Sequence, residues 1–582
     1  MSRRKVTSVG AVLGVIVFLI IGLLIVRYIP TKERMSLTEY FNINEDTLEN
    51  AYALTIKNQV MDQKALKEEG KFYIDLNTVN GYLNSRFYYD GTQIIFTTPT
   101  QIITVLPEEM IYRVDGVEEG LPYVPVIRKN DQTVYIALDF IKQFTNLTFK
   151  VDSSPNRIWI WNEYGEAIRY STVAKNTSIR YKGGIKSKIV KDVLAGDQVI
   201  VIEEVGKWTK VQSDDGIVGY IKSDMLGQIS EKMLTNDFEE LEYTSITKDY
   251  KISMAWHQSL ESSGIAGLSQ ILDRAIGLNT ISPTWFTLVD EKGNFESRAD
   301  KAYVNQAHEA GVEVWALVDN INVPIDSHAL LSNTVARTNL IEGLMQAVEE
   351  FDLDGINVDF ESIKEETGKH YIQFIRELSV ACRNAGIVLS IDNYAPTVGT
   401  YHYDRKEQGV VADYVIIMGY DEHWSGGDSA GSSASLPFVK KGIEDTLKEV
   451  PAEKVINALP FFTRLWCETP EEMADGNAKI ITNSDSKYKT YALSSVAKGM
   501  KAAKEILQEH SVTPVWLEEE AQYYGEYEYE NRFYRIWVED ERSIQEKLNI
   551  MKTYNLAGVS AWKLGLEDEG IWSIIDQYVK GE

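Results

Sequence analysis

The chain has 582 residues, which is too long for one hydrophobic core, and at roughly 150 residues per domain it predicts about four units. Its formal net charge of -27 repels phosphate backbones and anionic lipid, which argues against nucleic acid as a partner and favours an uncharged or cationic ligand. The only cysteines are Cys382 and Cys467, which excludes a disulfide-dense scaffold and a thiolate zinc cluster. Cys382 falls on the apolar stripe of an expected helix, so we expect it to pack in a core.

The N-terminus begins with a basic cluster that is followed by an uncharged apolar run. Three basic residues at positions 3–5 precede residues 6–26, a run about as long as a helix needs to cross a bilayer. A cleaved signal peptide is the alternative, but the run exceeds a typical signal core and residues 27–30 offer no small-residue cleavage site. We therefore predict that residues 1–30 are a cytoplasmic tail and an uncleaved, single-pass transmembrane anchor at the cell membrane. The orientation, with the rest of the chain extracellular, follows from the modules downstream, because basic residues flank the run on both sides.

Residues 70–162 contain the same pattern twice. Each copy has a β-rich run, a short helical stretch and two further β-rich runs separated by a polar turn, beginning at Phe72 and at Val134. The arrangement resembles the N-terminal repeat domain of copper amine oxidases, and we assign residues 40–165 to a small α+β module of this kind. All seven histidines lie at or after His257, so the module lacks the ligands that copper prefers, and we predict no metal there. Its expected role is spacing or wall contact.

Residues 171–228 carry short β-rich runs with turn signals, which predict a small all-β barrel. A Gly-Asp turn, then Trp208, then Gly219-Tyr220-Ile221, resemble bacterial Src-homology-3-like domains, which often bind cell-wall peptide or glycan. The resemblance implies cell-wall contact through this module. Trp208 and Tyr220 have two open roles, which are packing of the barrel and direct contact with a ligand.

Over residues 250–582, single β-rich runs alternate with helical stretches, which is typical of parallel βα units. This alternation predicts an α/β fold, a (β/α)8 TIM barrel. The eight expected strands are residues 252–256, 280–288, 312–318, 355–361, 387–391, 414–420, 455–459 and 558–562.

The fourth expected strand reads DGINVDFE over residues 354–361. With a period of two, its apolar residues face the surrounding helices, while Asn357, Asp359 and Glu361 face the barrel interior. Burying a carboxylate costs on the order of several kcal/mol unless it is paired or neutralised, so chemistry is the expected reason for this pattern. Glu361 comes last and lies at the C-terminal mouth, where barrel enzymes bind substrate. We expect Asp359 to raise the pKa of Glu361 and so keep it protonated, as a general acid requires.

This run resembles the signature of glycoside hydrolase family 18, the chitinase family, in which a Gly follows the first Asp and a Glu ends the strand. The resemblance implies substrate-assisted retaining hydrolysis, in which the 2-acetamido oxygen of the sugar attacks the anomeric carbon. It makes Glu361 the catalytic acid and base and makes Asp359 the group that orients and stabilises the oxazolinium. Asn357 stands where the family accepts Asp or Asn.

Two further stretches resemble the same family at matching strands. Tyr420 ends the sixth strand, where the family carries a catalytic Tyr that hydrogen-bonds the acetamido carbonyl, and an Asp, here Asp421, follows it. Trp562 ends the eighth strand, where an aromatic face lies under the sugar. The other residues assigned to the substrate-binding cleft are Asn357, Met418, Trp256, Asn393 and Tyr394. We also expect Glu422, His423 and Trp424 to line it, although His423 has the alternative of a satisfied loop histidine.

The tyrosine-rich stretch from about Ser484 to Arg542 lies between strands seven and eight and resembles the small α+β insertion that walls one side of the cleft in this family. We therefore expect a membrane-anchored extracellular glycosidase of the chitinase, endo-β-N-acetylglucosaminidase or spore-cortex-lytic type, which cleaves β-linked N-acetylglucosamine polymers such as peptidoglycan or chitin. The alternative is a catalytically silent, chitinase-like lectin, but inactive relatives usually lose the acid and Glu361 is present. No metal or organic cofactor is implied, because the reaction needs only an acid, a carboxylate and the acetamide of the substrate.

Overall fold

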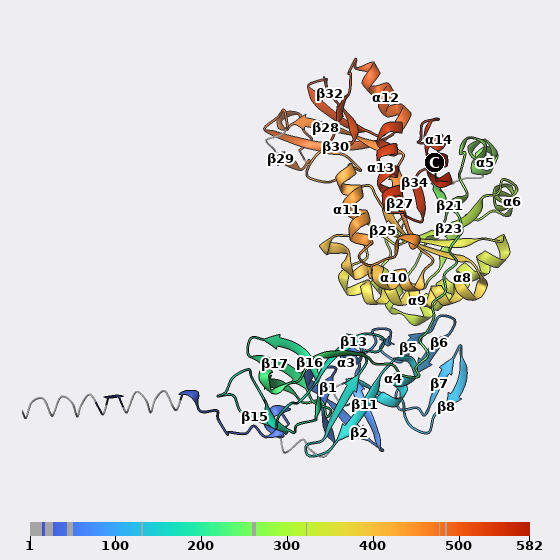
Figure 1. Cartoon of the computed structure of the whole chain (residues 1–582). Helices are drawn as coiled ribbons and strands as arrows, with labels where there is room; N and C mark the ends of the chain where they lie inside the picture. The colour runs from blue at the N-terminus through green and yellow to red at the C-terminus, as the bar shows by residue number, and fades with distance from the viewer. Residues whose placement is uncertain are drawn as a thin grey trace, which may run out of the picture. The chain divides into compact units, whose positions relative to one another are not determined.

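The computed structural model describes residues 14, 16–17, 27–43, 50–129, 132–258, 263–321, 323–476, 478–482 and 486–581 (Figure 1). The chain divides into two compact units, one made of residues 1–96 and 103–241 and the other of residues 97–102 and 242–582. The anchor predicted at residues 6–26 falls almost wholly outside the described residues. Among the residues that are described, no helix is both long and apolar enough to cross a bilayer.

The N-terminal unit contains the predicted internal repeat. The first copy consists of β3 (Lys71–Asp75), α3 (Leu76–Tyr82), β4 (Tyr88–Tyr89) and β5 (Ile94–Thr97), and the second of β10 (Val134–Ala137), α4 (Leu138–Phe144), β11 (Thr148–Asp152) and β12 (Arg157–Trp161). The two copies meet where β3 and β10 pair in antiparallel fashion, with Ile74 opposite Ile136. The order of strand, helix and hairpin in both copies is confirmed.

The two hairpins of the repeat enter different sheets. The hairpin of β11 and β12 belongs to a seven-stranded sheet of order β11-β12-β1-β2-β3-β10-β9, which also contains β1 (Ala51–Ile56), β2 (Gln59–Glu68) and β9 (Val126–Arg128). The hairpin of β4 and β5 instead belongs to a five-stranded sheet with β6 (Ile102–Val105), β7 (Ile111–Val114) and β8 (Val117–Gly120).

A second seven-stranded sheet follows the repeat, as the short β-rich runs predict. Its order is β15-β14-β18-β17-β16-β13-β19, with β13 (Ala167–Thr172), β14 (Thr177–Arg180), β15 (Ile189–Val193), β16 (Gln198–Val205), β17 (Trp208–Gln212), β18 (Val218–Lys222) and β19 (Ser230–Met233). Trp208 and Tyr220 are half-buried and lie over Gly183, where an added Cβ would be 3.4 Å from each of them. The short helix α2 (Leu37–Tyr40) leads into Phe41, which is buried in this core with Ile179 and Val211.

The C-terminal unit is an eight-stranded parallel barrel, and every predicted barrel strand is present. In sheet order the strands are β20 (Ile252–His257), β34 (Gly558–Trp562), β27 (Val455–Pro460), β26 (Tyr414–Met418), β25 (Val388–Tyr394), β24 (Gly355–Asp359), β23 (Glu313–Asp319) and β21 (Thr280–Leu288), and β20 also pairs with β21 to close the barrel. A short strand, β22 (Phe295–Ser297), adds to β21 in antiparallel fashion. The first residue of β24 is Gly355. A larger residue would not fit there, because an added Cβ would come within 2.8 Å of Trp315 and 2.9 Å of the Val388 carbonyl.

Helices follow the barrel strands and cover their outer faces (Figure 1). They are α5 (Ser263–Arg274), α6 (Lys301–Glu309), α7 (Ser327–Ser332), α8 (Thr334–Phe351), α9 (Gly368–Ala385), α10 (Arg405–Val411), α11 (Leu436–Thr446), α13 (Glu541–Thr553) and α14 (Ile571–Lys580). The apolar stripe of α9 is buried, and it includes Cys382, which is 1% exposed. Burial raises the pKa of this thiol well above its usual range, so the predicted packing role of Cys382 is confirmed.

The insertion between β27 and β34 begins at Phe462, earlier than the predicted start near Ser484. It is a six-stranded sheet of order β29-β30-β28-β33-β32-β31 with one helix, and its elements are β28 (Phe462–Pro470), β29 (Ile480–Thr482), β30 (Thr490–Gly499), α12 (Met500–Glu509), β31 (Val515–Leu517), β32 (Gln522–Tyr529) and β33 (Arg532–Val538). A buried ion pair joins it to the barrel helices, since Lys547 of α13 lies 2.9 Å from both carboxylate oxygens of Glu539, which follows β33.

Candidate active site

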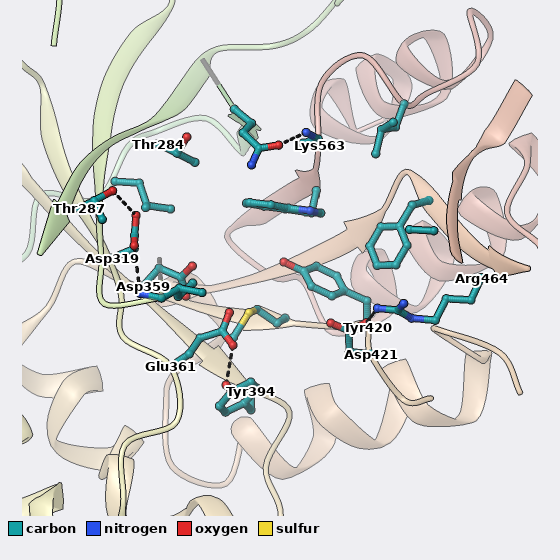
Figure 2. A pocket seen from close by; sticks show the side chains of 18 of the residues that line it. Thr284, Thr287, Asp319, Asp359, Glu361, Tyr394, Tyr420, Asp421, Arg464 and Lys563 are labelled. Carbon is teal, nitrogen blue, oxygen red and sulfur yellow. Dashed lines mark hydrogen bonds and ion pairs between the residues drawn. The ribbon is translucent and has the colours of Figure 1, made fainter. Parts of the chain in front are cut away.

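A cavity of about 640 Å³ opens at the C-terminal ends of the barrel strands (Figure 2). Most of the site residues predicted from the sequence line it, and these are Asp359, Glu361, Tyr394, Met418, Tyr420, Asp421 and Trp562. They come from the ends of β24, β25, β26 and β34, so four strands that are spread over two hundred residues of sequence contribute to one cavity. The barrel fold therefore brings the predicted carboxylates and aromatic side chains together.

Glu361 is held in place through its backbone as well as its side chain. β24 ends at Asp359, two residues before the predicted end, and Glu361 follows. The Glu361 backbone N–H donates to Asn320 Oδ1 at 2.8 Å, and Asn320 Nδ2 donates to the Glu361 carbonyl at 2.9 Å. Just before it, Phe360 points outward and stacks on Phe374 of α9 at 5.4 Å between ring centroids. The Glu361 side chain is thereby directed into the cavity.

The Tyr394 hydroxyl donates a hydrogen bond to Glu361 Oε2 at 2.7 Å (Figure 2). The pKa of Glu361 is raised, first by burial and then by the charges of Asp421 and Asp319, while the Tyr394 hydrogen bond opposes the shift. The repulsion between Asp359 and Glu361 acts on the pKa of Asp359, and burial is the main cause of the raised pKa of Glu361. A raised pKa favours the protonated form that a general acid needs.

Two aspartates lie deeper in the barrel than Glu361. Asp359 is 6% exposed and Asp392, on β25, is 2% exposed. The pKa of Asp359 is raised well above its usual range by burial and by the charges of Asp392, Glu361 and Asp319, and burial raises the pKa of Asp392 to about 8. Asp359 lines the cavity and Asp392 does not.

Three predicted cleft residues do not reach the cavity. Asn357 is fully buried beneath it, where its amide oxygen accepts hydrogen bonds from Trp256 Nε1 at 2.9 Å and Ser282 Oγ at 3.1 Å. Trp256 is 1% exposed and packs beside Trp562, with 5.8 Å between ring centroids. Asn393 points away from the barrel interior and donates to Gln408 Oε1 of α10 at 2.7 Å. All three residues are buried and support the site in this structure, and their assignment to substrate binding stays a prediction.

Of the residues that follow β26, the first two predicted site residues line the cavity and the next three do not. Tyr420 is 9% exposed and lines the cavity, where its ring packs edge-on against Phe462 at 5.9 Å. Asp421 accepts a 3.4 Å hydrogen bond from Arg464 Nη2. Glu422, His423 and Trp424 do not line the cavity. Glu422 accepts hydrogen bonds from the backbone and hydroxyl of Ser435 at the start of α11, and His423 Nδ1 lies 2.8 Å from the Ser432 carbonyl, so the alternative of a satisfied loop histidine is confirmed.

Several lining residues were not predicted from the sequence. Asp319 ends β23 and is in register with Asp359 of β24, and it accepts a hydrogen bond from Thr287 Oγ1 at 3.2 Å. The same strand-end position that marks Asp359 marks Asp319, so alternation along β23 is the signal that identifies it. The insertion supplies Phe462, Arg464 and Ala497, whereas its Trp516, Tyr523, Tyr524 and Tyr527 lie elsewhere. Gln258, Thr284, Arg298, Leu317, Ile321, Lys563 and Leu566 complete the lining.

The cavity holds carboxyl groups beside aromatic rings. Within the part of the chain that the structure describes, no group of three or more His, Cys, Asp or Glu side chains is arranged to hold a metal ion. A protonated Glu361 can donate to a leaving oxygen, and Asp359 can oppose positive charge that develops next to it. This is the chemistry of a glycosidase.

Comparison with known proteins places the barrel in a class. Residues 326–567 match the family model for Glycosyl hydrolases family 18, and residues 175–227 match the model for Bacterial SH3 domain. The C-terminal unit is therefore similar to Glycosyl hydrolases family 18 over most of its barrel, and the N-terminal unit is similar to bacterial SH3 domains over residues 175–227.

Individual relatives agree with this class. The chain is 26% identical over 316 residues to the uncharacterized glycosylase YvbX of Bacillus subtilis (strain 168), a match that covers 52% of this chain and 85% of the relative. It is 26% identical over 267 residues to the cortical fragment-lytic enzyme of Bacillus anthracis, covering 44% of this chain and only 57% of that relative. A solved structure, the C-terminal domain of a protein assigned as a chitinase from Desulfitobacterium hafniense DCB-2, has a TM-score of 0.50 at 19% identity and covers 57% of this chain and 100% of that chain. This last likeness concerns the fold alone.

Proposed function

We propose that this chain is a retaining glycoside hydrolase that cleaves β-linked N-acetylglucosamine polymers of the peptidoglycan or chitin kind. The observation that carries the proposal is the position of Glu361, a carboxyl group with a raised pKa that points into a cavity beside the buried Asp359 and the ring of Trp562. The relatives support the substrate class, because one of them is a cortical fragment-lytic enzyme.

In the proposed reaction, Glu361 donates its proton to the glycosidic oxygen while the acetamide oxygen of the substrate attacks the anomeric carbon. Asp359 then opposes the positive charge of the oxazolinium, and the Tyr420 hydroxyl donates a hydrogen bond to the acetamide oxygen. Trp562 packs against the apolar face of the sugar. The Glu361 carboxylate next takes a proton from water, which attacks the same carbon and restores the original configuration.

We also propose that residues 1–30 anchor the enzyme in the cell membrane with the barrel outside the cell. The support is the uncharged run at residues 6–26 after a basic cluster, together with the bacterial SH3 match at residues 175–227, since such domains often bind wall material. The copper amine oxidase-like repeat at residues 40–165 is then a spacer between membrane and wall.

The test uses the full chain, purified in detergent, with peptidoglycan and with chitin oligosaccharides in separate incubations. We expect new reducing ends at N-acetylglucosamine, identified by mass spectrometry, and their loss by at least about 10³-fold in Glu361→Gln. Glu365→Gln, which makes the same change at an exposed position four residues away, is the matched control and keeps full activity.

Each outcome separates the candidates. Fragments from peptidoglycan make the protein a wall or cortex hydrolase, and fragments from chitin alone make it a chitinase. Binding of either polymer without cleavage contradicts the proposal and favours a sugar-binding protein.

A further inference from the structure

Asp359, which lines the cavity, has a second buried aspartate, Asp392, on the neighbouring strand. Asp359 ends β24 and Asp392 lies on β25, and these parallel strands pair with Val358 opposite Ile391, so the two aspartates are the next pair in register. Because inward side chains alternate along both strands, the two carboxyl groups enter the barrel at the same level. Neither residue is more than 6% exposed.

The orientation of Asp392 is fixed by Asn357. The indole N–H of Trp256 can only donate, so the Asn357 oxygen must face it and the Asn357 amide nitrogen must face the opposite side. That nitrogen donates to Asp392 Oδ1 at 2.9 Å and to Ser390 Oγ at 3.0 Å. Asp392 Oδ1 is therefore satisfied as an acceptor, and Oδ2 remains as the oxygen that can carry a proton.

One oxygen of each aspartate lacks a hydrogen-bond donor among the described residues, and these are Asp359 Oδ1 and Asp392 Oδ2. A single proton held between the two carboxyl groups would give both oxygens a partner and would remove one of two like charges from a dry interior. Among the described residues, the titratable groups that act on the pair are acidic or phenolic. They are Asp319 of β23, Glu361 after β24, Tyr371 of α9, Tyr403 in the turn at Val398–Tyr403 and Tyr420 after β26.

We propose that Asp392 is a positioning residue that exchanges one shared proton with Asp359. When the cationic oxazolinium forms, the O–H bond at Asp359 breaks and an O–H bond at Asp392 Oδ2 forms. The pair keeps one proton and one negative charge, but the charge now lies on Asp359, the member that lines the cavity. The use of this exchange in turnover rests on the proposed function, whereas the shared proton itself does not.

The pKa values of the two groups agree with a retained proton at neutral pH. Burial and mutual repulsion raise the pKa of Asp359 well above its usual range, and the pKa of Asp392 is about 8. Because the two titrate together, the proton belongs to the pair and not to either residue.

Difference infrared spectroscopy on the full chain tests the shared proton without substrate. In a Glu361→Gln background at neutral pH, we expect one protonated carboxyl band that disappears in both Glu361→Gln/Asp392→Asn and Glu361→Gln/Asp359→Asn. In each double variant the new amide supplies the donor, so the remaining aspartate is ionised. A band that persists at full intensity in the Asp392→Asn variant, or no difference between any of the three proteins, would overturn the proposal.

Kinetics with the otherwise native chain test the role of the exchange. Asp392→Asn is expected to lower kcat by about 10–100-fold while KM changes by less than about 3-fold. Ser390→Ala is the matched control, because it removes another hydrogen-bond partner of Asn357 on the same strand and leaves both carboxyl groups in place. Equal kcat in these two variants would overturn the positioning role. A wild-type chain that shows the infrared result but no turnover refutes the proposed function and leaves the shared proton standing.

Discussion

Among single residues, Asn357 and Asp359 both point inward from one strand, but Asn357 is enclosed and Asp359 meets the cavity. Alternation along β24 correctly predicts that both face inward. It does not give depth, and a step of two residues moves a side chain about 6.6 Å along the strand. At the lower level the space is already filled by Trp256 and Ser282, so Asn357 becomes a hydrogen-bonded support. Depth depends on which neighbours fill each layer, and that information lies on other strands.

Tyr394 provides a test of how the acid is tuned. Its hydroxyl is the donor that lowers the pKa of Glu361 against the effect of burial, so Tyr394→Phe is expected to raise this pKa further. Because the acid must be protonated for the first step, the alkaline limb of the pH profile of kcat/KM moves to higher pH, by about 0.5–1 unit. The measurement is the pH dependence of oligosaccharide cleavage. A limb that moves to lower pH would contradict this account of the hydrogen bond.

At the level of elements, the barrel strands are predictable and the start of the insertion is not. The barrel strands are apolar runs separated by helical stretches, which is what a sheet buried on both faces requires. After β27, the chain continues through Pro460, Phe461 and Phe462 into β28 with no glycine or asparagine turn to mark the change. The sequence therefore shows β27 and β28 as one apolar stretch. They are distinguished only in the structure, where β27 pairs within the barrel and β28 pairs within the sheet of the insertion.

The buried ion pair of Lys547 and Glu539 predicts an asymmetric effect on stability. Both side chains are at most 1% exposed, so Lys547→Met leaves an unpaired buried carboxylate and should lower the free energy of unfolding by about 3–5 kcal/mol. Lys441→Met is the matched control, because Lys441 pairs with Asp445 while its own side chain is 71% exposed, and its loss should cost less than about 1 kcal/mol. Urea unfolding followed by circular dichroism measures both. Equal effects would show that burial of the pair is not what matters.

For the molecule as a whole, the division into modules follows from changes of pattern along the sequence, but the position of the first segment does not. A strand, helix and hairpin that occur twice, and eight strands that alternate with helices, are long enough to be recognised. The helix at Leu37–Tyr40 has only four residues, and the chain then packs Phe41 against Ile179 and Val211, which lie more than a hundred residues later in the sequence. Such a long-range contact leaves no periodic signal.

The carboxyl groups of the barrel also set how its stability depends on pH. Glu361 has a raised pKa in the folded state, so above the pKa of the unfolded chain, near about 4.3, the folded state binds more protons than the unfolded state. Its contribution to stability is therefore present at low pH and is lost as the pH rises through the folded pKa.

Glu361→Gln removes this penalty, and we expect the variant to melt about 1–3 °C higher than the wild type near pH 7.5 and at the same temperature near pH 4. Calorimetry at the two pH values provides the measurement. A variant that is less stable at neutral pH would mean that ionised Glu361 contributes favourable contacts in the folded protein.

The residues that line the cavity come from two parts of the chain, the barrel and the insertion. Asp359 and Glu361 lie at the end of β24 of the barrel, while Phe462, Arg464 and Ala497 reach the cavity from the β28–β30 pair of the insertion. A change in the length or sequence of the insertion can therefore reshape the cavity without moving Glu361. The shape of the cavity and the carboxyl groups at its floor can then change independently in the course of evolution.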